Sequence, residues 1–239
     1  VWEGGCANAD TVAELEKLAC LVGGVQAGLR SAGPVRQCNR RRGCVSRMHV
    51  PVFTPYSSIV VEVGGIGHPG KIDHKAPIVC LDQLYAQASG VQSFLESKVR
   101  KWAKQSNGLL PTGPREYIPW PDEDFEGEMV SLKQPRRAIH KLLRCYNGDI
   151  SRLLDLCRQR VVFNDVGDLS RCFSLLADDP EIVIERVKNR LDPTVCAVRS
   201  VGYRTLIINF RIDVGITRWI GIETHVVEVQ LCLRAMYDG

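Results

Sequence analysis

The sequence predicts an α+β fold, a mixed twisted sheet of about four to five strands flanked by helices, with a mostly helical N-terminal extension. Apolar residues recur at helical spacing through much of the first half. In the second half, the β-branched runs 181–187, 203–212 and 225–233 follow helical segments closely, which is typical of one layered domain. A Gly- and Pro-rich stretch over 108–127 separates the halves, so we expect one unit over 1–127 and another over 128–239.

The elements of the first half follow from local patterns. Residues 9–30 carry helical spacing, which Gly23-Gly24 interrupts. Residues 30–47 hold six arginines and no acidic residue, which indicates a basic loop. The β-branched run 56–63 predicts a strand, and 78–104 predicts a long amphipathic helix.

The second half begins with a basic helix over 132–145. Residues 150–159 are expected to form a second helix that runs directly into a short strand at 160–163. Asn164 or Asp165 then caps a helix that ends at Leu176, because a side-chain oxygen at this place can accept from a free backbone N–H. The three strands named above complete the sheet.

Composition excludes several classes of protein. No window of about 18 residues is free of polar side chains, so we expect no membrane-spanning helix. The net charge is +4, from 31 basic and 27 acidic side chains. This balance is too weak to argue for a nucleic-acid partner, although it suits an anionic small ligand.

The ten cysteines include no C-x-x-C pair, and the closest two, Cys38 and Cys44, have only His49 near them. Zinc is therefore disfavoured, and we interpret the cysteines as reduced thiols. We accordingly expect an intracellular, reducing compartment, either the cytosol or an organelle interior such as the plastid stroma. The chain begins at Val1 without a signal pattern and ends after a strand-like run, so we expect an ordered part of a longer protein.

Two segments of the first half resemble phosphate-binding motifs. Residues 65–70 spell G-x-G-x-x-G, and Lys71 completes a Walker A motif except for its final hydroxyl, because Ile72 stands there. Pro77 also disfavours a helix directly after the loop, so a hairpin or surface turn is the better interpretation and a P-loop hydrolase only a remote one. The arginines of the basic loop could bind phosphates, but a solvated loop or docking surface is favoured; they are Arg36, Arg40, Arg41, Arg42 and Arg47.

The second half brings acidic and basic residues into regular positions. Cations recur every three or four residues along 133–144, which makes one helix face strongly positive. Asp155 precedes a strand, and strand alternation places Glu228, Gln230 and Cys232 on one face of another. Two carboxylates with several cations are what metal-assisted phosphoryl transfer needs. A sheet face whose polar residues meet solvent or pair with each other explains the pattern equally well.

Five short motifs in this half resemble, in the same order, those of the synthetase domain of the RelA/SpoT family, the alarmone synthetases of nucleotidyltransferase-like fold. The resemblance covers roughly residues 128–233. The basic helix is matched by 133–141, D-L-x-x-x-R by 153–162, K-D-Y by 188–190, G-Y-Q-S-L by 202–206 and E-V-Q by 228–230.

The resemblance implies Mg²⁺-dependent transfer of pyrophosphate from ATP to the 3′-hydroxyl of GDP or GTP, which yields (p)ppGpp. Asp155 and Glu228 would be the catalytic residues and the metal ligands, and Glu228 would also activate the attacking hydroxyl. Tyr203 would stack on the guanine of the acceptor. The implied nucleotide-binding residues are Lys133, Lys141, Lys188, Arg199, Tyr203 and Gln230.

The sequence also departs from the family. Ile207 stands where the family has a histidine and Cys232 where it has an arginine, while Arg137, His140 and Arg199 replace a serine, an arginine and a lysine. Each lost charge-assisted contact is worth roughly 1.5–3 kcal/mol, or about 10- to 100-fold in rate. The alternative is therefore a catalytically degenerate module that serves as a structural or binding subunit and meets protein partners in a larger assembly.

Overall fold

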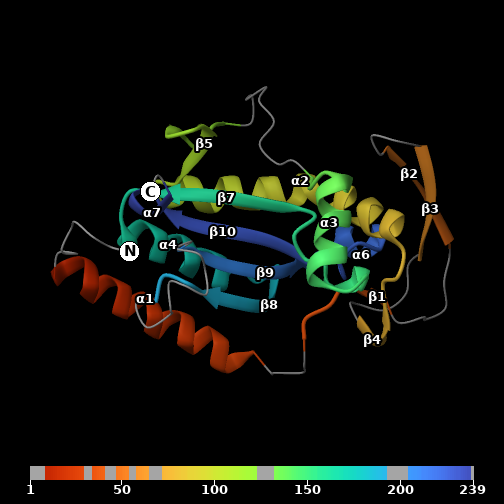
Figure 1. Cartoon of the computed structure of the whole chain (residues 1–239), viewed down its shortest axis with the longest axis horizontal. Coiled ribbons are helices and arrows are strands. Elements are labelled where there is room, and N and C mark those ends of the chain that lie inside the picture. Colours follow the sequence, from red (N-terminus) through yellow and green to blue (C-terminus); the bar gives the residue numbers. More distant parts are fainter. Residues whose placement is uncertain are drawn as a thin grey trace.

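A computed structural model describes residues 9–29, 34–40, 47–53, 58–64, 72–122, 132–192 and 204–237. Over these residues the chain forms a six-stranded mixed sheet, two two-stranded sheets and flanking helices (Figure 1). The predicted α+β class with one mixed sheet and an N-terminal helix is therefore confirmed. The large sheet has six strands rather than four to five.

The large sheet has the strand order β6-β5-β7-β10-β9-β8. Strands β7 and β10 run parallel, with Glu228 paired to Arg158, while the other neighbours in the sheet are antiparallel. The bounds are β5 (Leu109–Gly113), β6 (Glu116–Pro119), β7 (Arg158–Phe163), β8 (Ile182–Asn189), β9 (Leu206–Ile212) and β10 (Val227–Leu233).

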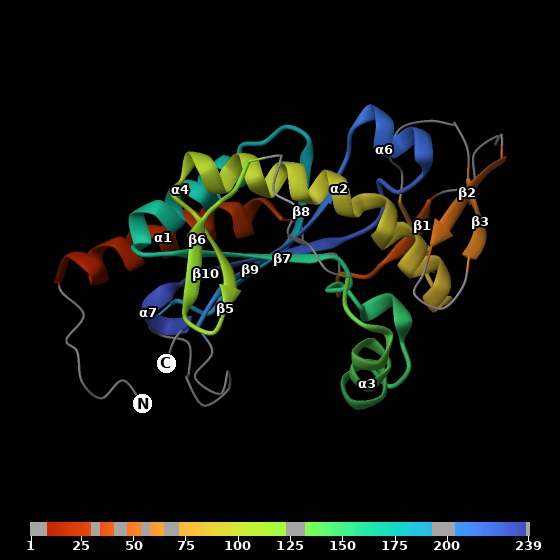
Figure 2. The same cartoon turned by 90° about the horizontal axis from the view of Figure 1, so that it is seen from above.

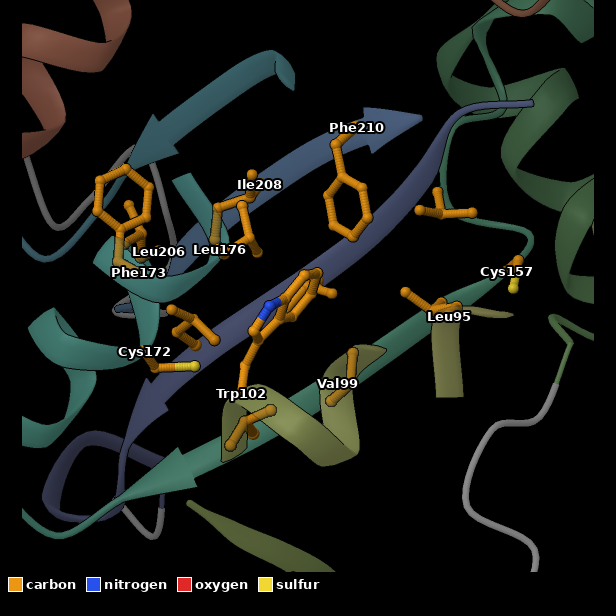
Figure 3. Close-up of a cluster of buried hydrophobic side chains, with 14 of the residues drawn as sticks. Leu95, Val99, Trp102, Cys157, Cys172, Phe173, Leu176, Leu206, Ile208 and Phe210 are labelled. Carbon is orange, nitrogen blue, oxygen red and sulfur yellow. The ribbon is translucent and has the colours of Figure 1, made fainter. Parts of the chain in front are cut away.

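Three helices cover one face of this sheet, namely α1 (Ala9–Gly28), α2 (Leu81–Gln105) and α4 (Val166–Ala177) (Figure 2). All three were predicted, and α1 continues through the two glycines expected to interrupt it. Asp165 caps α4 as predicted, because its side chain accepts from the backbone N–H of Asp168 at 2.8 Å. Trp102 of α2 meets Phe210 of β9 edge-on, with ring centroids 5.8 Å apart, at the centre of the core (Figure 3).

The opposite face of the sheet carries polar side chains. Val227, Val229 and Leu231 point into the core under the helices, so Glu228 and Gln230 point away from it. The same alternation, followed through the strand register, places side chains of four strands on this polar face. They are Arg158 and Arg160 of β7, Glu228 and Gln230 of β10, Ile207 and Asn209 of β9, and Arg186 and Lys188 of β8.

Helix α3 (Pro135–Cys145) lies on the side of the polar face, away from α1, α2 and α4 (Figure 2). It matches the basic helix predicted over 132–145. The short helices α6 (Gly215–Ile220) and α7 (Arg234–Tyr237) complete the second half. Among the described helices none is long and apolar enough to cross a membrane.

The predicted helix over 150–159 is wrong. The chain makes one 3₁₀ turn, η1 (Ile150–Arg152), and then runs extended into β7, which begins at Arg158. Leu153, Leu154 and Leu156 are all buried, although an amphipathic helix would leave part of such a run exposed. A short run that is buried on all sides has no periodicity that separates a helix from an extended chain.

The first half contains more strands than expected. Hairpin β5–β6 falls within the supposed linker 108–127 and joins the large sheet, while the boundary between 127 and 128 stays a prediction. The predicted strand 56–63 appears as β3 (Ser58–Gly64), which pairs with β2 (Arg47–Phe53). Strand β1 (Cys38–Arg40), within the expected basic loop, pairs with β4 (Ile72–Pro77). The glycine motif at 65–70 and the arginines Arg41 and Arg42 lie outside the described residues.

Candidate functional site

Asp155 is the centre of a buried ion cluster. It lies in the extended segment between η1 and β7, and 4% of its surface is exposed. Lys133 Nζ and Lys141 Nζ both donate to Asp155 Oδ2, at 2.6 and 2.8 Å. Arg158 Nη1 lies 3.9 Å from the same oxygen. Asp155 Oδ1 is buried and accepts no hydrogen bond from any described residue.

Local structure places both lysines beside Asp155. Lys133 lies just before α3, where its backbone N–H donates to Leu156 O at 2.8 Å and Tyr85 Oη donates to its carbonyl at 2.5 Å. Pro135 begins α3, a position at which its missing N–H costs nothing. Lys141 follows two turns later on the helix side that faces Asp155. Both lysines were predicted to bind nucleotide, and that role stays a prediction; the structure brings both to one carboxylate.

The ion cluster shifts the pKa values of its members. Burial raises the pKa of Asp155, but the charges and hydrogen bonds of Lys141 and Lys133 outweigh it, so the pKa lies below its usual value. Burial lowers the pKa of Lys133 despite the opposing effect of Asp155. The pKa of Lys141 is raised, because Asp155 and Tyr146 outweigh its burial. Asp155 is therefore ionised at neutral pH and two lysines share its charge.

Glu228 lies in a second network on the polar face, with 7% of its surface exposed. Its Oε1 accepts from Gln230 Nε2 at 2.7 Å, and its Oε2 accepts from Asn209 Nδ2 at 3.3 Å. Each amide in turn accepts from a guanidinium. Arg160 Nη2 donates to Gln230 Oε1 at 3.0 Å, and Arg186 Nη2 donates to Asn209 Oδ1 at 2.7 Å. The carboxylate thus stands between two amides, and two arginines hold the amides in orientation.

The two carboxylates lie at the same end of two neighbouring parallel strands, Asp155 just before β7 and Glu228 in β10. Glu228 N donates to Cys157 O at 3.1 Å, two residues beyond Asp155, where the β7–β10 ladder begins. Burial lowers the pKa of Arg186, while the charges of Glu228, Tyr146 and Asp155 oppose this shift. The bond from Glu228 N to Cys157 O therefore places the ion cluster and the Glu228 network next to each other at the start of the β7–β10 ladder.

Lys188 lies on the same face, two residues after Arg186 along β8. Desolvation lowers its pKa, and the nearby charges of Arg186 and Arg190 lower it further, against a smaller opposing effect of Glu228. The structure thus brings six of the eight predicted site residues together. These are Asp155, Glu228, Lys133, Lys141, Lys188 and Gln230. The remaining two, Arg199 and Tyr203, lie outside the described residues.

Sequence reasoning gave no site role to three residues of the Glu228 network, Asn209, Arg186 and Arg160, although Arg160 is the arginine of the D-L-x-x-x-R match. Asn209 is the one polar residue between Leu206 and Phe210, and it is fully buried. A lone amide in an apolar strand is a signal that could have been used, because a buried polar group requires a partner. Arg186 precedes Lys188 by two residues, so strand alternation alone would place both side chains on one face.

The two main departures from the family motifs fall on or beside this face. Ile207 pairs with Gln230 in the β9–β10 ladder and contributes an apolar side chain. Cys232 is buried, with its Sγ 3.4 Å from Thr205 Oγ1. Neither position supplies a charge. The guanidinium nearest to Gln230 is that of Arg160, from the adjacent strand.

Asp155 and Glu228 are the described residues that could hold a magnesium ion. The described residues contain no group of three or more His, Cys, Asp or Glu side chains that could hold a metal. Mg²⁺, however, is usually held by one or two carboxylates, waters and substrate phosphates. Asp155 Oδ1 is a buried oxygen without a hydrogen bond, and the two amides orient Glu228 as outer-shell groups orient ligating carboxylates.

No family model matches the chain, and no curated protein matches its sequence. The chain is similar to the solved structure of small alarmone synthetase 1 from Bacillus subtilis bound to its product pppGpp, with 15% identity, a TM-score of 0.45 and coverage of 65% of this chain and 73% of that one. Small alarmone synthetase 2 from Bacillus subtilis is 18% identical, with a TM-score of 0.43 and coverage of 65% of this chain and 72% of that one. A GTP pyrophosphokinase family protein from Streptococcus pneumoniae is 17% identical, with a TM-score of 0.41 and coverage of 65% of this chain and 68% of that one.

Proposed function

We propose that the polar face binds nucleotides and transfers pyrophosphate from ATP to the 3′-hydroxyl of GDP or GTP with the help of Mg²⁺. One observation carries the proposal: Asp155, just before β7, and Glu228, at the start of β10, are both buried at the same end of two parallel strands and are surrounded by cations. Carboxylates that hold a metal and cations that neutralise phosphates are the two components that phosphoryl transfer requires.

The charge balance of the site supports a polyanionic ligand. Six cations surround two carboxylates, and burial lowers the pKa of three of them, because their charged forms lack full compensation. A bound polyphosphate would supply the missing negative charge and stabilise the protonated lysines. The six cations are Lys133, Lys141, Arg158, Arg160, Arg186 and Lys188.

In the proposed step, the 3′-oxygen of the acceptor forms a bond to the β-phosphorus of ATP. The bond between this phosphorus and the oxygen that bridges it to the α-phosphate breaks, and AMP leaves with that oxygen. Glu228 accepts the hydroxyl proton, while Asn209 and Gln230 hold the carboxylate in place. Asp155 and Glu228 would hold Mg²⁺, which supplies charge stabilisation at the phosphate oxygens. The surrounding cations orient the phosphates for in-line displacement.

A second candidate function is binding without turnover, as a subunit of a larger assembly. The observation that favours it is that Ile207 and Cys232 place neutral side chains where the family motifs have a histidine and an arginine. Under this reading the cations still bind nucleotide or an acidic partner, but no product forms.

Calorimetric titration with GDP and with a non-hydrolysable ATP analogue, each with and without Mg²⁺, tests the proposal. We expect Mg²⁺-dependent binding of both, lost in Asp155→Asn and kept in the matched control Asp168→Asn. Asp168 belongs to α4, which packs against the face of the sheet opposite the polar face (Figure 2). A product assay then separates the two functions. Glu228→Gln abolishes synthesis if the chain is an enzyme, whereas absence of product in the unchanged chain favours binding without turnover. Absence of nucleotide binding at millimolar concentration would refute both nucleotide-based readings.

A further inference from the structure

We propose that Gln37, in the segment before β1, is a positioning residue that fixes Asp155 relative to Glu228; this inference rests on the function proposed above. Gln37 lies outside residues 128–233, the range of the motifs that resemble those of the alarmone synthetases. Its side chain is fully buried and touches the backbone just before each of the two carboxylates.

The amide of Gln37 joins two segments that are distant in sequence. Its Nε2 donates to Leu153 O at 3.2 Å and to Val226 O at 2.8 Å, and its Oε1 accepts from Val226 N at 2.8 Å. Leu153 and Val226 each lie two residues before a carboxylate of the site, Asp155 and Glu228. Both side-chain N–H groups and the carbonyl of Gln37 are therefore used for this single bridge.

The backbone of Gln37 is held in place as well. Gln37 N donates to Ser151 O at 2.7 Å, and Ile78 N donates to Gln37 O at 3.0 Å. The residue is thus anchored to η1 on one side and to the segment before α2 on the other. Such an anchored side chain can define a distance between the segments that it bridges, because it has no freedom to follow either of them.

The sheet alone does not fix Asp155. The β7–β10 ladder begins at the pair of Arg158 and Glu228, so Asp155 precedes it and lies in extended chain. On one side this chain is held by Lys133 N, which donates to Leu156 O. Glu228 N donates to Cys157 O after Asp155, and Gln37 adds a second connection before Asp155, from Leu153 to the residue that precedes β10. Two metal ligands on separate segments need such a connection, because small shifts in their separation weaken a shared ion.

The test compares Gln37→Leu and Gln37→Met with Gln87→Leu, which makes the same chemical change at a buried glutamine of α2. Methionine keeps the length and approximate shape of glutamine, so this variant is expected to fold if leucine does not. Three measurements are made on the full chain: amide hydrogen exchange at Val226, affinity for GDP without metal, and the gain in affinity on addition of Mg²⁺.

We expect exchange at Val226 to accelerate by about 100-fold or more in both Gln37 variants, because its acceptor is gone. Affinity for GDP without Mg²⁺ should change less than threefold, since the cations remain, while the gain from Mg²⁺ should fall at least tenfold. Gln87→Leu should leave all three quantities unchanged. A merely structural role would lower affinity with and without Mg²⁺ in parallel.

An unchanged Mg²⁺ gain in the Gln37 variants, together with normal exchange at Val226, would overturn the inference. If the unaltered chain binds no nucleotide, the proposed function fails instead. In that case the exchange measurement still decides whether Gln37 holds the two segments together, so the two failures are distinguishable.

Discussion

Replacement of Asn209 by alanine should destabilise the protein through the Glu228 network. Asn209 is fully buried, accepts from Arg186 and donates to Glu228, so both of these partners are charged. Hydrogen bonds to charged groups contribute roughly 1.5–3 kcal/mol each. The bond to Glu228 is long at 3.3 Å, so we expect a combined loss in the free energy of unfolding of about 3 kcal/mol.

Urea denaturation followed by circular dichroism measures this loss. The matched control is Asn39→Ala, which should cost about 1 kcal/mol, because the partners of the Asn39 side chain among the described residues are neutral: Ala76 O at 3.1 Å, Pro77 O at 3.5 Å and Gln83 Nε2 at 2.7 Å. A double-mutant cycle with Arg186→Met isolates the Arg186–Asn209 coupling, which we expect to reach about 1.5 kcal/mol. A coupling below about 0.5 kcal/mol would refute the view that Arg186 orients Glu228 through Asn209.

Two further predictions concern His225, which is fully buried, and Ile207, which lies on the polar face. Burial lowers the pKa of His225 to about 3, so this residue stays neutral in the folded protein. In the unfolded chain the same imidazole binds a proton near pH 6.5, so the free energy of unfolding falls as pH drops from about 6.5 towards 3. The urea midpoints of His225→Phe should lack this part of the pH dependence. Ile207→His introduces a polar side chain beside Gln230 and should increase nucleotide affinity by about 10- to 100-fold in calorimetry. Weaker binding would show that this position faces away from phosphate.

Local patterns were sufficient for much of the sheet and its helices. The cap at Asp165 and the alternation around Glu228 depend on neighbours one to three residues away, so they can be read from sequence. Hairpin β5–β6 was missed because its Gly- and Pro-rich residues are typical of a linker, although Leu109 pairs with Val162 of β7. The error over 150–159 has a different origin, since full burial removes the periodicity on which helix predictions depend.

The site itself could be predicted only in part. Lys133, Lys141 and Asp155 belong to motifs, and the structure shows that they are in direct contact. Gln37 gave no signal, because its partners Leu153 and Val226 are 116 and 189 residues away in sequence, and they contribute backbone atoms rather than side chains. Backbone partners leave no pattern of residue types.

This distribution of contacts changes how the site should be tested. The RelA/SpoT-like motifs begin near residue 128, yet Gln37 bridges the two carboxylate segments and the hydroxyl of Tyr85 holds the carbonyl of Lys133. Both residues belong to the first half of the chain, which also supplies Trp102 against the core face of the sheet. If a fragment of the second half failed to bind nucleotide, the loss of these supporting contacts would explain the result as readily as a site that cannot bind nucleotide. Point variants in the full chain, where the supporting residues remain, separate these two causes.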